Sequence, residues 1–250
     1  MRVEIWSDVA CPWCYVGKAR FARALDGFAH KDRVEVVFRS FELDPNADRE
    51  AVPVLPMLAR KYGRSLEEAR AMSEHVATTA RAEGLPYEVD GRLHGNTFDV
   101  HRLLHLAAAR GRQDALLDLA FRANFAEDRS VFEHPTLVAL AVEAGLDEAE
   151  ARAVLADPTA YADEVRADER EAAELGASAV PFFVLDRRYG ISGGQPTEVF
   201  AQALEQAWSE RAEAAAEAEG AAGGPASTAA ADPDAEACGP EGCEVPAARP

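Results

Sequence analysis

Hydrophobic and polar residues alternate or repeat with different periods along the chain, and these periods predict its elements. Residues 2–6 alternate around Val3 and Ile5, which predicts a short strand. Residues 12–28 carry apolar side chains on one helical face, and residues 34–41 are rich in β-branched and aromatic residues, typical of a second strand. This order predicts a β-α-β unit with parallel strands and a right-handed crossover.

The middle of the chain has no convincing strand pattern. Residues 53–176 show a run of helical patterns, one from Pro135 to Gly145 and another from Asp157 to Leu175, each with start and stop signals. We therefore expect an all-helical insertion at 53–176, flanked by the two parts of a core domain, 1–52 and 177–208.

The strand pattern returns near the end of the core. Residues 181–185 (PFFVL) and 188–192 flank a turn at Asp186–Arg187, which predicts a hairpin, and residues 197–207 predict a final amphipathic helix. The predicted fold class is α/β, in the order β-α-β, helical insertion, β-β-α.

Residues 209–250 differ in composition from the rest of the chain. They contain nine acidic residues against two arginines, and Val245 is their one large apolar residue. Such a segment cannot bury enough apolar surface to offset its ordering entropy, so we expect a flexible acidic tail. Its first part, residues 210–219, is rich in Ala and Glu and is predicted to extend the last helix.

Charge and hydropathy exclude several classes of partner. The formal net charge of −18 argues against nucleic-acid binding, which needs clustered Lys and Arg. No stretch approaches the roughly 18 apolar residues of a membrane span. The first residues, MRVEIWSDVA, lack the basic start and apolar run of a secretory signal, so we expect a cytoplasmic protein.

The four cysteines form two local pairs, Cys11 with Cys14 and Cys238 with Cys243. A disulfide-stapled fold would spread cysteines through the body of the chain, so redox chemistry or metal binding is the better interpretation. Zinc would need both pairs as ligands, and the second pair lies on the predicted tail. We expect no metal, while a structural disulfide or two buried core cysteines stay open as alternatives.

The motif Cys11-Pro12-Trp13-Cys14 follows a predicted strand and opens a predicted helix. Amides and the macrodipole at a helix N-terminus stabilise an anion, so Cys11 is the expected attacking thiolate and should be the more exposed sulfur. Cys14, on the same face, would resolve the mixed disulfide. Pro12 suits the first helical turn. Trp13 adds no cation, which predicts a milder oxidant than a CPHC motif.

Four segments resemble the DsbA-like thioredoxin family, and within it the FrnE-type dithiol oxidoreductases. They are SDVACPWCYVGKARF (7–21), NTFDVHRLLHLA (96–107), GASAVPFFVLDRRYGISGGQP (176–196) and EVFAQAL (198–204). The resemblance implies a thioredoxin fold and disulfide reduction or isomerisation of protein or peptide substrates. It also implies that Pro181 is cis and faces the dithiol, and that Val180 shapes the substrate groove.

The resemblance also bears on partners. It implies no bound cofactor, an electron partner such as glutathione or the thioredoxin system, a role under oxidative stress, and a monomer or homodimer. Some FrnE-type proteins have a C-terminal extension with a cysteine pair. By that likeness Cys238 and Cys243 are candidates for relaying electrons to or from Cys11 and Cys14.

Two other functions stay open. Glutathione-dependent 2-hydroxychromene-2-carboxylate isomerases belong to the same group, but typically have Ser at the position of Cys11. A redox-inactive chaperone that binds unfolded segments beside Pro181 is the other alternative. Four histidines of the insertion are expected to be structural; they are His94, His101, His105 and His134.

Overall fold

A computed structural model describes residues 1–127 and 129–222, and residues 212–222 as helical backbone only. Met1–Arg211 forms one compact unit. The last helix, α9 (Thr197–Ala222), continues past residue 207, which confirms the predicted extension. The rest of the predicted tail, with Cys238 and Cys243, lies outside the described residues. Across the described ranges, no helix combines the length and apolarity needed to cross a bilayer.

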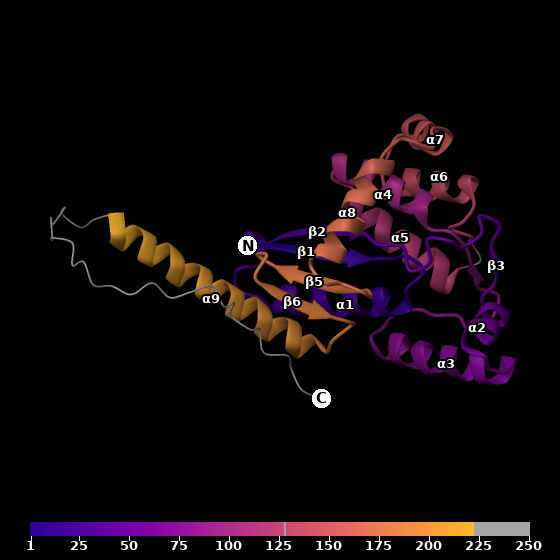
Figure 1. The fold of residues 1–250 in the computed structure, drawn as a ribbon, viewed down its shortest axis with the longest axis horizontal. Coiled ribbons are helices and arrows are strands. Elements are labelled where there is room, and N and C mark those ends of the chain that lie inside the picture. Colours follow the sequence, from indigo (N-terminus) through magenta and orange to yellow (C-terminus); the bar gives the residue numbers. More distant parts are fainter. Residues whose placement is uncertain (128, 223–250) are drawn as a thin grey trace, which may run out of the picture. The chain divides into compact units, whose positions relative to one another are not determined.

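A four-stranded mixed sheet with the order β2-β1-β5-β6 forms the centre of this unit (Figure 1). Strand β1 (Arg2–Ser7) pairs parallel with β2 (Glu35–Ser40), as the predicted β-α-β unit requires. Strand β1 also pairs antiparallel with β5 (Phe182–Leu185), which forms the predicted hairpin with β6 (Tyr189–Ser192). Strands from before and after the insertion therefore form one sheet.

Helix α1 (Pro12–Gly27) and a 3-10 turn (Lys31–Arg33) connect β1 to β2. The inserted helices are α2 (Val54–Tyr62), α3 (Leu66–Ala82), α4 (Phe98–Ala109), α5 (Gln113–Ala126), α6 (His134–Glu143), α7 (Glu148–Ala156) and α8 (Ala162–Glu174). The insertion is not entirely helical, however, because β3 (Val52–Pro53) pairs with β4 (Leu93–His94). Strands of two residues are too short to show an alternating pattern, so the sequence could not reveal them.

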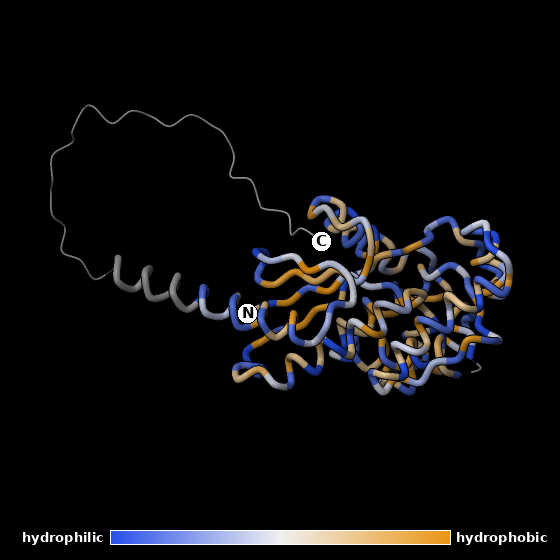
Figure 2. The backbone as a smooth tube through the Cα atoms, turned by 90° about the horizontal axis from the view of Figure 1, so that it is seen from below, coloured by the Kyte–Doolittle hydropathy of each residue, from blue (hydrophilic) through white to orange (hydrophobic). Residues whose placement is uncertain are grey.

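Both faces of the sheet are buried, and successive residues of β1 point to opposite faces. Ile5 pairs in register with Phe183, whose ring lies 5.5 Å from that of Phe21 on α1. On the other face Trp6 donates a hydrogen bond from Nε1 to the backbone carbonyl of Asp168 on α8, at 2.8 Å. Figure 2 shows the resulting band of hydrophobic residues along the central strands. Burial on both faces explains why these strands are largely apolar.

A buried carboxylate joins α8 to the edge of the sheet. Asp168 accepts hydrogen bonds from the Ser40 amide at 2.9 Å and from Arg39 Nη1 at 3.1 Å, and its Oδ2 lies 3.2 Å from His105 Nε2. Burial by itself would raise the pKa of Asp168, but His105, the Ser40 amide and Arg39 outweigh it and lower the pKa. Folding therefore favours the ionised carboxylate.

We predict that Asp168→Asn destabilises the fold by about 3 kcal/mol at neutral pH, because it removes the charge of a buried carboxylate that pairs with Arg39 and accepts a hydrogen bond from the Ser40 amide. The contribution of Asp168 is present above the unfolded carboxyl pKa, near 4, and is lost as the pH falls through the lower folded value. Urea unfolding of wild type and variant at several pH values measures this. The two stabilities should converge in acid. The exposed Asp163→Asn on the same helix is the control, and an equal effect in it would contradict the assignment.

Candidate active site

Cys11 and Cys14 are free thiols at the N-terminus of α1. The Cys11 amide donates to the Asp8 carbonyl at 3.0 Å, which forms a turn directly after β1. Cys11 is the N-cap residue with extended backbone (φ −89°, ψ 112°), and Pro12 begins the helix, where a missing amide hydrogen has no cost. The amide of Cys14 then donates to the Cys11 carbonyl at 3.1 Å. This local geometry places the first sulfur at the positive end of the helix.

Both sulfurs are buried. Cys11 is 3% exposed and Cys14 is 1% exposed, whereas Trp13 between them is 37% exposed. Cys11 is thus slightly more exposed than Cys14, as expected, but both residues are buried. The loop before β5 accounts for this, because Cys11 Sγ donates to the backbone carbonyl of Val180 at 3.4 Å.

The two thiols interact with each other. Burial raises the pKa of the Cys14 thiol well above its ordinary value, and the neighbouring Cys11 raises it further. The backbone of Asp8 and the side chain of Ser7 hydrogen-bond to the Cys14 sulfur and partly oppose this rise. Burial therefore disfavours an anion at Cys14, which holds its proton in the dithiol form.

The Val180–Pro181 peptide bond is cis, and the loop that contains it packs against the first turns of α1. The amide of Gly193 donates to the Pro181 carbonyl at 2.8 Å. A Cβ at Gly17 would lie 3.0 Å from Pro181 Cγ and 3.2 Å from the Cα of Gly194. Arg20, one turn further along α1, donates to the Gly194 carbonyl at 2.7 Å. Glycines at 17 and 194 thus permit the close approach of helix and loop.

A buried carboxylate lies behind the active-site loop. Asp8 is 1% exposed and accepts hydrogen bonds from the amides of Ala10, at 3.2 Å, and Leu43, at 2.8 Å. These bonds join the loop before Cys11 to the segment that follows β2. Burial alone would raise the pKa of Asp8, but its interactions with His101 and with the two amides lower it.

The partner of Asp8 is His101 on α4, which is also 1% exposed, with its Nε2 3.5 Å from Asp8 Oδ1. Burial would lower the pKa of His101, but the Asp8 carboxylate outweighs burial and raises it. Sequence reasoning assigned His101 a structural role and did not single out Asp8. The one sequence signal for a role of Asp8 was its position three residues before Cys11. The partner of Asp8 could not be found from the sequence, because only the fold brings α4 behind this loop.

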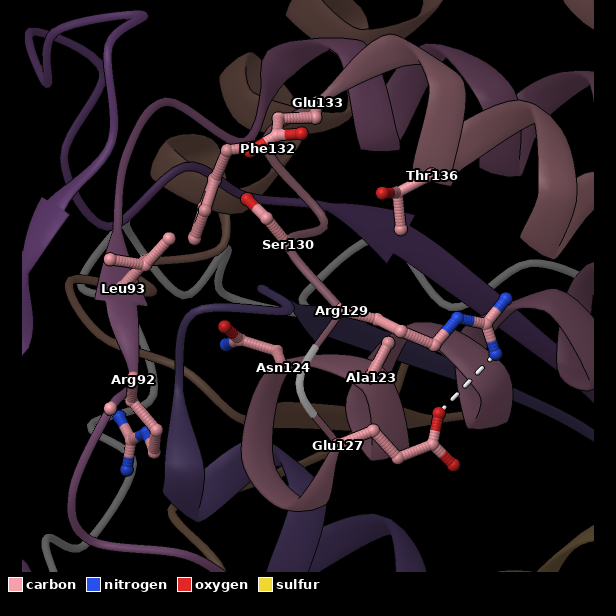
Figure 3. Close-up of a pocket in the computed structure, with 11 residues that line it drawn as sticks. Arg92, Leu93, Ala123, Asn124, Glu127, Arg129, Ser130, Phe132, Glu133 and Thr136 are labelled. Atoms are coloured by element: carbon pink, nitrogen blue, oxygen red, sulfur yellow. Dashed lines mark hydrogen bonds and ion pairs between the residues drawn. The ribbon is translucent and has the colours of Figure 1, made fainter.

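A pocket of about 270 Å³ lies beside the same loop (Figure 3). Asn124 lines it and donates from its side chain to the Val9 carbonyl at 2.9 Å. Arg129 pairs with Glu127 along the pocket wall at 3.3 Å. Neither Cys11 nor Cys14 is among the described residues that line this pocket. The Asn124 side chain therefore holds the active-site loop in place, whereas the pocket that Asn124 lines is not lined by the two cysteines.

The other three histidines singled out in the sequence also lie near carboxylates, and His94 Nε2 is 3.6 Å from Asp44 Oδ2. His134 Nε2 lies 2.7 Å from Asp99 Oδ2, and His105 contacts Asp168 as described above. Among the described residues, no three His, Cys, Asp or Glu side chains gather as a metal-binding group. The second predicted pair, Cys238 and Cys243, lies outside the described part of the chain. Of the predicted site residues, the structure thus brings together those of the CPWC motif and the Val180–Pro181 loop.

The fold and the paired thiols are those of a thioredoxin-like protein, and the chain belongs to the family of DSBA-like thioredoxin domains, which matches residues 2–205. It is 61% identical to a probable DsbA oxidoreductase from Streptomyces coelicolor, with a TM-score of 0.81 over 99% of this chain and 100% of that one.

More distant structures share the fold alone. The cytosolic disulfide reductase DsbM from Pseudomonas aeruginosa is 21% identical, with a TM-score of 0.58 over 82% of this chain and 98% of that one. A 2-hydroxychromene-2-carboxylate isomerase is 14% identical, with a TM-score of 0.64 over 85% of this chain and 98% of that one. The fold therefore accommodates both redox and isomerase chemistry, and the side chains at the site must decide between them.

We predict that Gly17→Ala displaces the Val180–Pro181 loop, because its methyl group would meet Pro181 and Gly194 at 3.0–3.2 Å. The free energy of unfolding should fall by about 1–3 kcal/mol, and thiol–disulfide exchange should slow. Gly27→Ala is the matched control, since a Cβ at Gly27 of the same helix has no atom within 4 Å. That control should leave exchange unchanged and slightly stabilise the helix. Wild-type exchange in Gly17→Ala would show that the close approach does not position the site.

Proposed function

We propose that this protein is a thiol–disulfide oxidoreductase that reduces or isomerises disulfides in protein or peptide substrates through Cys11 and Cys14. One observation carries the proposal: two free, interacting thiols lie at the start of α1, and the first bonds to the carbonyl beside a cis proline. A structural cysteine pair would need neither the helix N-terminus nor the adjacent loop. The family to which the chain belongs supports the same chemistry.

In the first step the Cys11 thiolate attacks a substrate disulfide, and the electron pair of the broken bond leaves on the substrate's second sulfur. The S–H of Cys11 donates to the Val180 carbonyl. Loss of that proton leaves Cys11 without a hydrogen to donate, so ionisation also releases the Val180 carbonyl. The attacking anion and a free acceptor for the substrate thus form together.

The Val180 carbonyl then becomes available to an extended substrate peptide. Backbone hydrogen bonds to residue 180 would align the peptide beside Cys11 in the manner of strand addition. Val180 and Trp13 supply apolar contacts, since Trp13 is 37% exposed beside the dithiol. Recognition through the backbone tolerates many substrate sequences, as a general disulfide reductase requires.

In the second step Cys14 attacks Cys11 Sγ in the mixed disulfide. A Cys11–Cys14 disulfide forms and the reduced substrate leaves as a thiol. The raised pKa of Cys14 keeps it protonated until the mixed disulfide forms. A protonated Cys14 is a poor nucleophile, so Cys14 does not compete with Cys11 in the attack on the substrate disulfide.

We further propose a cytoplasmic setting in which a thiol reductant such as glutathione or the thioredoxin system returns the enzyme to its dithiol form, with a role under oxidative stress. Similarity in fold to a cytosolic disulfide reductase supports this setting. No bound cofactor is needed, because the two sulfurs carry both electrons. The proposal applies equally to a monomer and to a homodimer.

We predict that Cys11→Ser lowers dithiothreitol-driven insulin reduction to the uncatalysed rate, because the nucleophile is lost. Cys14→Ser should form a mixed disulfide with a cysteine-containing peptide that persists, since the resolving sulfur is missing. Mass spectrometry of the trapped complex measures this. The double variant is the control and should trap nothing. Full activity of Cys11→Ser would contradict the proposed function.

The same variant separates the two alternatives. A chaperone would suppress aggregation of unfolded protein equally well with Cys11→Ser, while the wild type would reduce no insulin. An isomerase would convert 2-hydroxychromene-2-carboxylate when glutathione is added, a reaction that needs no second cysteine. The presence of both Cys11 and Cys14 disfavours the isomerase.

Cys238 and Cys243 are proposed to exchange electrons with the active-site pair. Cys238 follows Ala222, the last residue of α9, by 16 residues (238 − 222), and a chain of that length can span up to roughly 55 Å. A tethered thiol pair within reach has an effective concentration on the order of millimolar.

We predict that Cys238→Ser with Cys243→Ser slows turnover several-fold with at least one physiological reductant, while single-turnover attack by Cys11 is unchanged. Rates should be measured with glutathione and with the thioredoxin system. The substitution of Ser227 and Thr228 by Ala, in the same segment, is the control. Unchanged turnover with every reductant would refute the relay and leave the function of Cys11 and Cys14 intact.

A further inference from the structure

A buried polar path connects the second sulfur of the active site to the inserted helix α4. It begins at Ser7, the last residue of β1, which is 5% exposed and whose side chain lies close enough to Cys14 to lower the pKa of that thiol. The path ends at His101, whose ring is buried behind the active-site loop. Neither residue takes part in the two exchange steps described above.

A small cavity of about 10 Å³ lies between them, and Ser7, Ser40 and His101 are among its lining residues. A cavity of this size holds about one water molecule. His101 Nδ1 has no hydrogen-bond partner among the described residues, and Nε2 has only the 3.5 Å ion-pair contact with Asp8. A buried ring with an unsatisfied nitrogen, beside a water-sized cavity that the polar residues Ser7 and Ser40 also line, is well placed to exchange a proton through it.

The charges around His101 favour its protonated form. The Asp8 carboxylate contacts its ring, and two further carboxylates raise its pKa from neighbouring elements: Glu42, after β2, and Glu169, on α8. Arg166, also on α8, bonds to both Glu42 and Glu169 and neutralises part of their charge. Arg39, on β2, lines the same cavity as His101 and adds a positive charge there.

We propose that His101 is the proton donor to Cys14 when the Cys11–Cys14 disulfide is opened by a thiol, acting through Ser7 and one water in the cavity. This inference rests on the proposed function of the dithiol. The need for a donor follows from the burial of Cys14, which makes its free anion costly.

The step balances as follows in atoms and electrons. An incoming thiolate attacks Cys11 Sγ and forms a new disulfide with it, and the Cys11–Cys14 bond breaks with its electron pair on Cys14. The proton on the His101 imidazolium passes to the cavity water, a proton passes from there to Ser7, and the Ser7 hydroxyl proton passes to Cys14. His101 becomes neutral and later recovers a proton from solvent. In the reverse direction, His101 accepts the proton that Cys14 loses.

The pH dependence has a definite sign. Since Asp8 raises the pKa of His101 above 6.5, the imidazolium persists beyond that pH. The rate constant for opening the enzyme disulfide, expressed per attacking thiolate, should be constant in mild acid. It should fall as the pH rises through the His101 pKa.

The test is stopped-flow reduction of the oxidised full-length enzyme by glutathione, followed by Trp fluorescence from pH 5.5 to 9. With Ser7→Ala, which leaves the Asp8–His101 pair intact, and with His101→Gln, we expect the opening step to slow about a hundredfold, within the usual range for general acids. Both variants should also lose the fall in rate at high pH. Attack of the reduced enzyme's Cys11 on a small aromatic disulfide should be unchanged, because that step needs no proton at Cys14.

Two control variants account for effects of burial alone. Ser73→Ala removes another serine that is 5% exposed, on α3, and His105→Gln removes a histidine one turn further along α4 that contacts Asp168. Both controls should keep the wild-type pH profile. His101→Gln removes the counter-charge of Asp8, so Ser7→Ala decides the outcome if that variant does not fold.

Wild-type opening rates and pH profile in Ser7→Ala would overturn the inference, and so would an equal loss in the control variants. If the wild type reduces insulin no faster than Cys11→Ser does, the proposed function itself fails. If insulin reduction requires both sulfurs but opening of the enzyme disulfide is unaffected by Ser7→Ala and His101→Gln, the function stands and the inference fails.

Discussion

The close packing of the first turns of α1 against the Val180–Pro181 loop is the contact on which the site depends. It brings the Cys11 sulfur to a backbone acceptor 169 residues away in the chain, at 3.4 Å. Gly17 and Gly194 leave no side chain between helix and loop, and Arg20 bonds the two together. A protein interior is packed densely enough that one added methyl group would shift this geometry.

The same contact explains why both thiols are buried in the dithiol form. Cys11 has its carbonyl partner in the loop, and Cys14 faces inward toward Ser7 and the backbone of Asp8. Reactivity then depends on which proton leaves first and where it goes. The Cys11 sulfur lies at the helix N-terminus beside a backbone acceptor, whereas burial disfavours an anion at Cys14, so the two sulfurs differ in environment.

The inserted helices do more than cover the sheet, because they supply charged partners to the core. Helix α4 contributes His101 to Asp8, and α8 contributes Asp168 to Arg39 and Ser40. Removing one member of such a buried pair is costly, since the other is left as an isolated charge. The insertion and the thioredoxin-like core therefore form one compact unit and not two separable ones.

Local sequence patterns determined much of the fold. Alternation in residues 2–6, the apolar run at 181–185, the amphipathic helix after Cys11, and the Asp186–Arg187 turn all predicted elements that the structure contains, within one or two residues. Asp186 and Arg187 have positive φ angles of 46° and 60°, as a tight hairpin turn requires. The strands β3 and β4 could not be predicted, since two residues carry no period. The burial of both cysteines could not be predicted either, because a helix N-terminus is open only until another segment packs on it.

By itself, then, the sequence determined the order of elements and the position of the CPWC dithiol at the start of a helix, because both follow from short-range patterns and from the chemistry of adjacent residues. Only the tertiary structure decided what faces that dithiol. The Val180 carbonyl, Gly194 and the Asp8–His101 pair come from segments far apart in the chain. Their proximity results from packing across the whole unit, which no local pattern encodes.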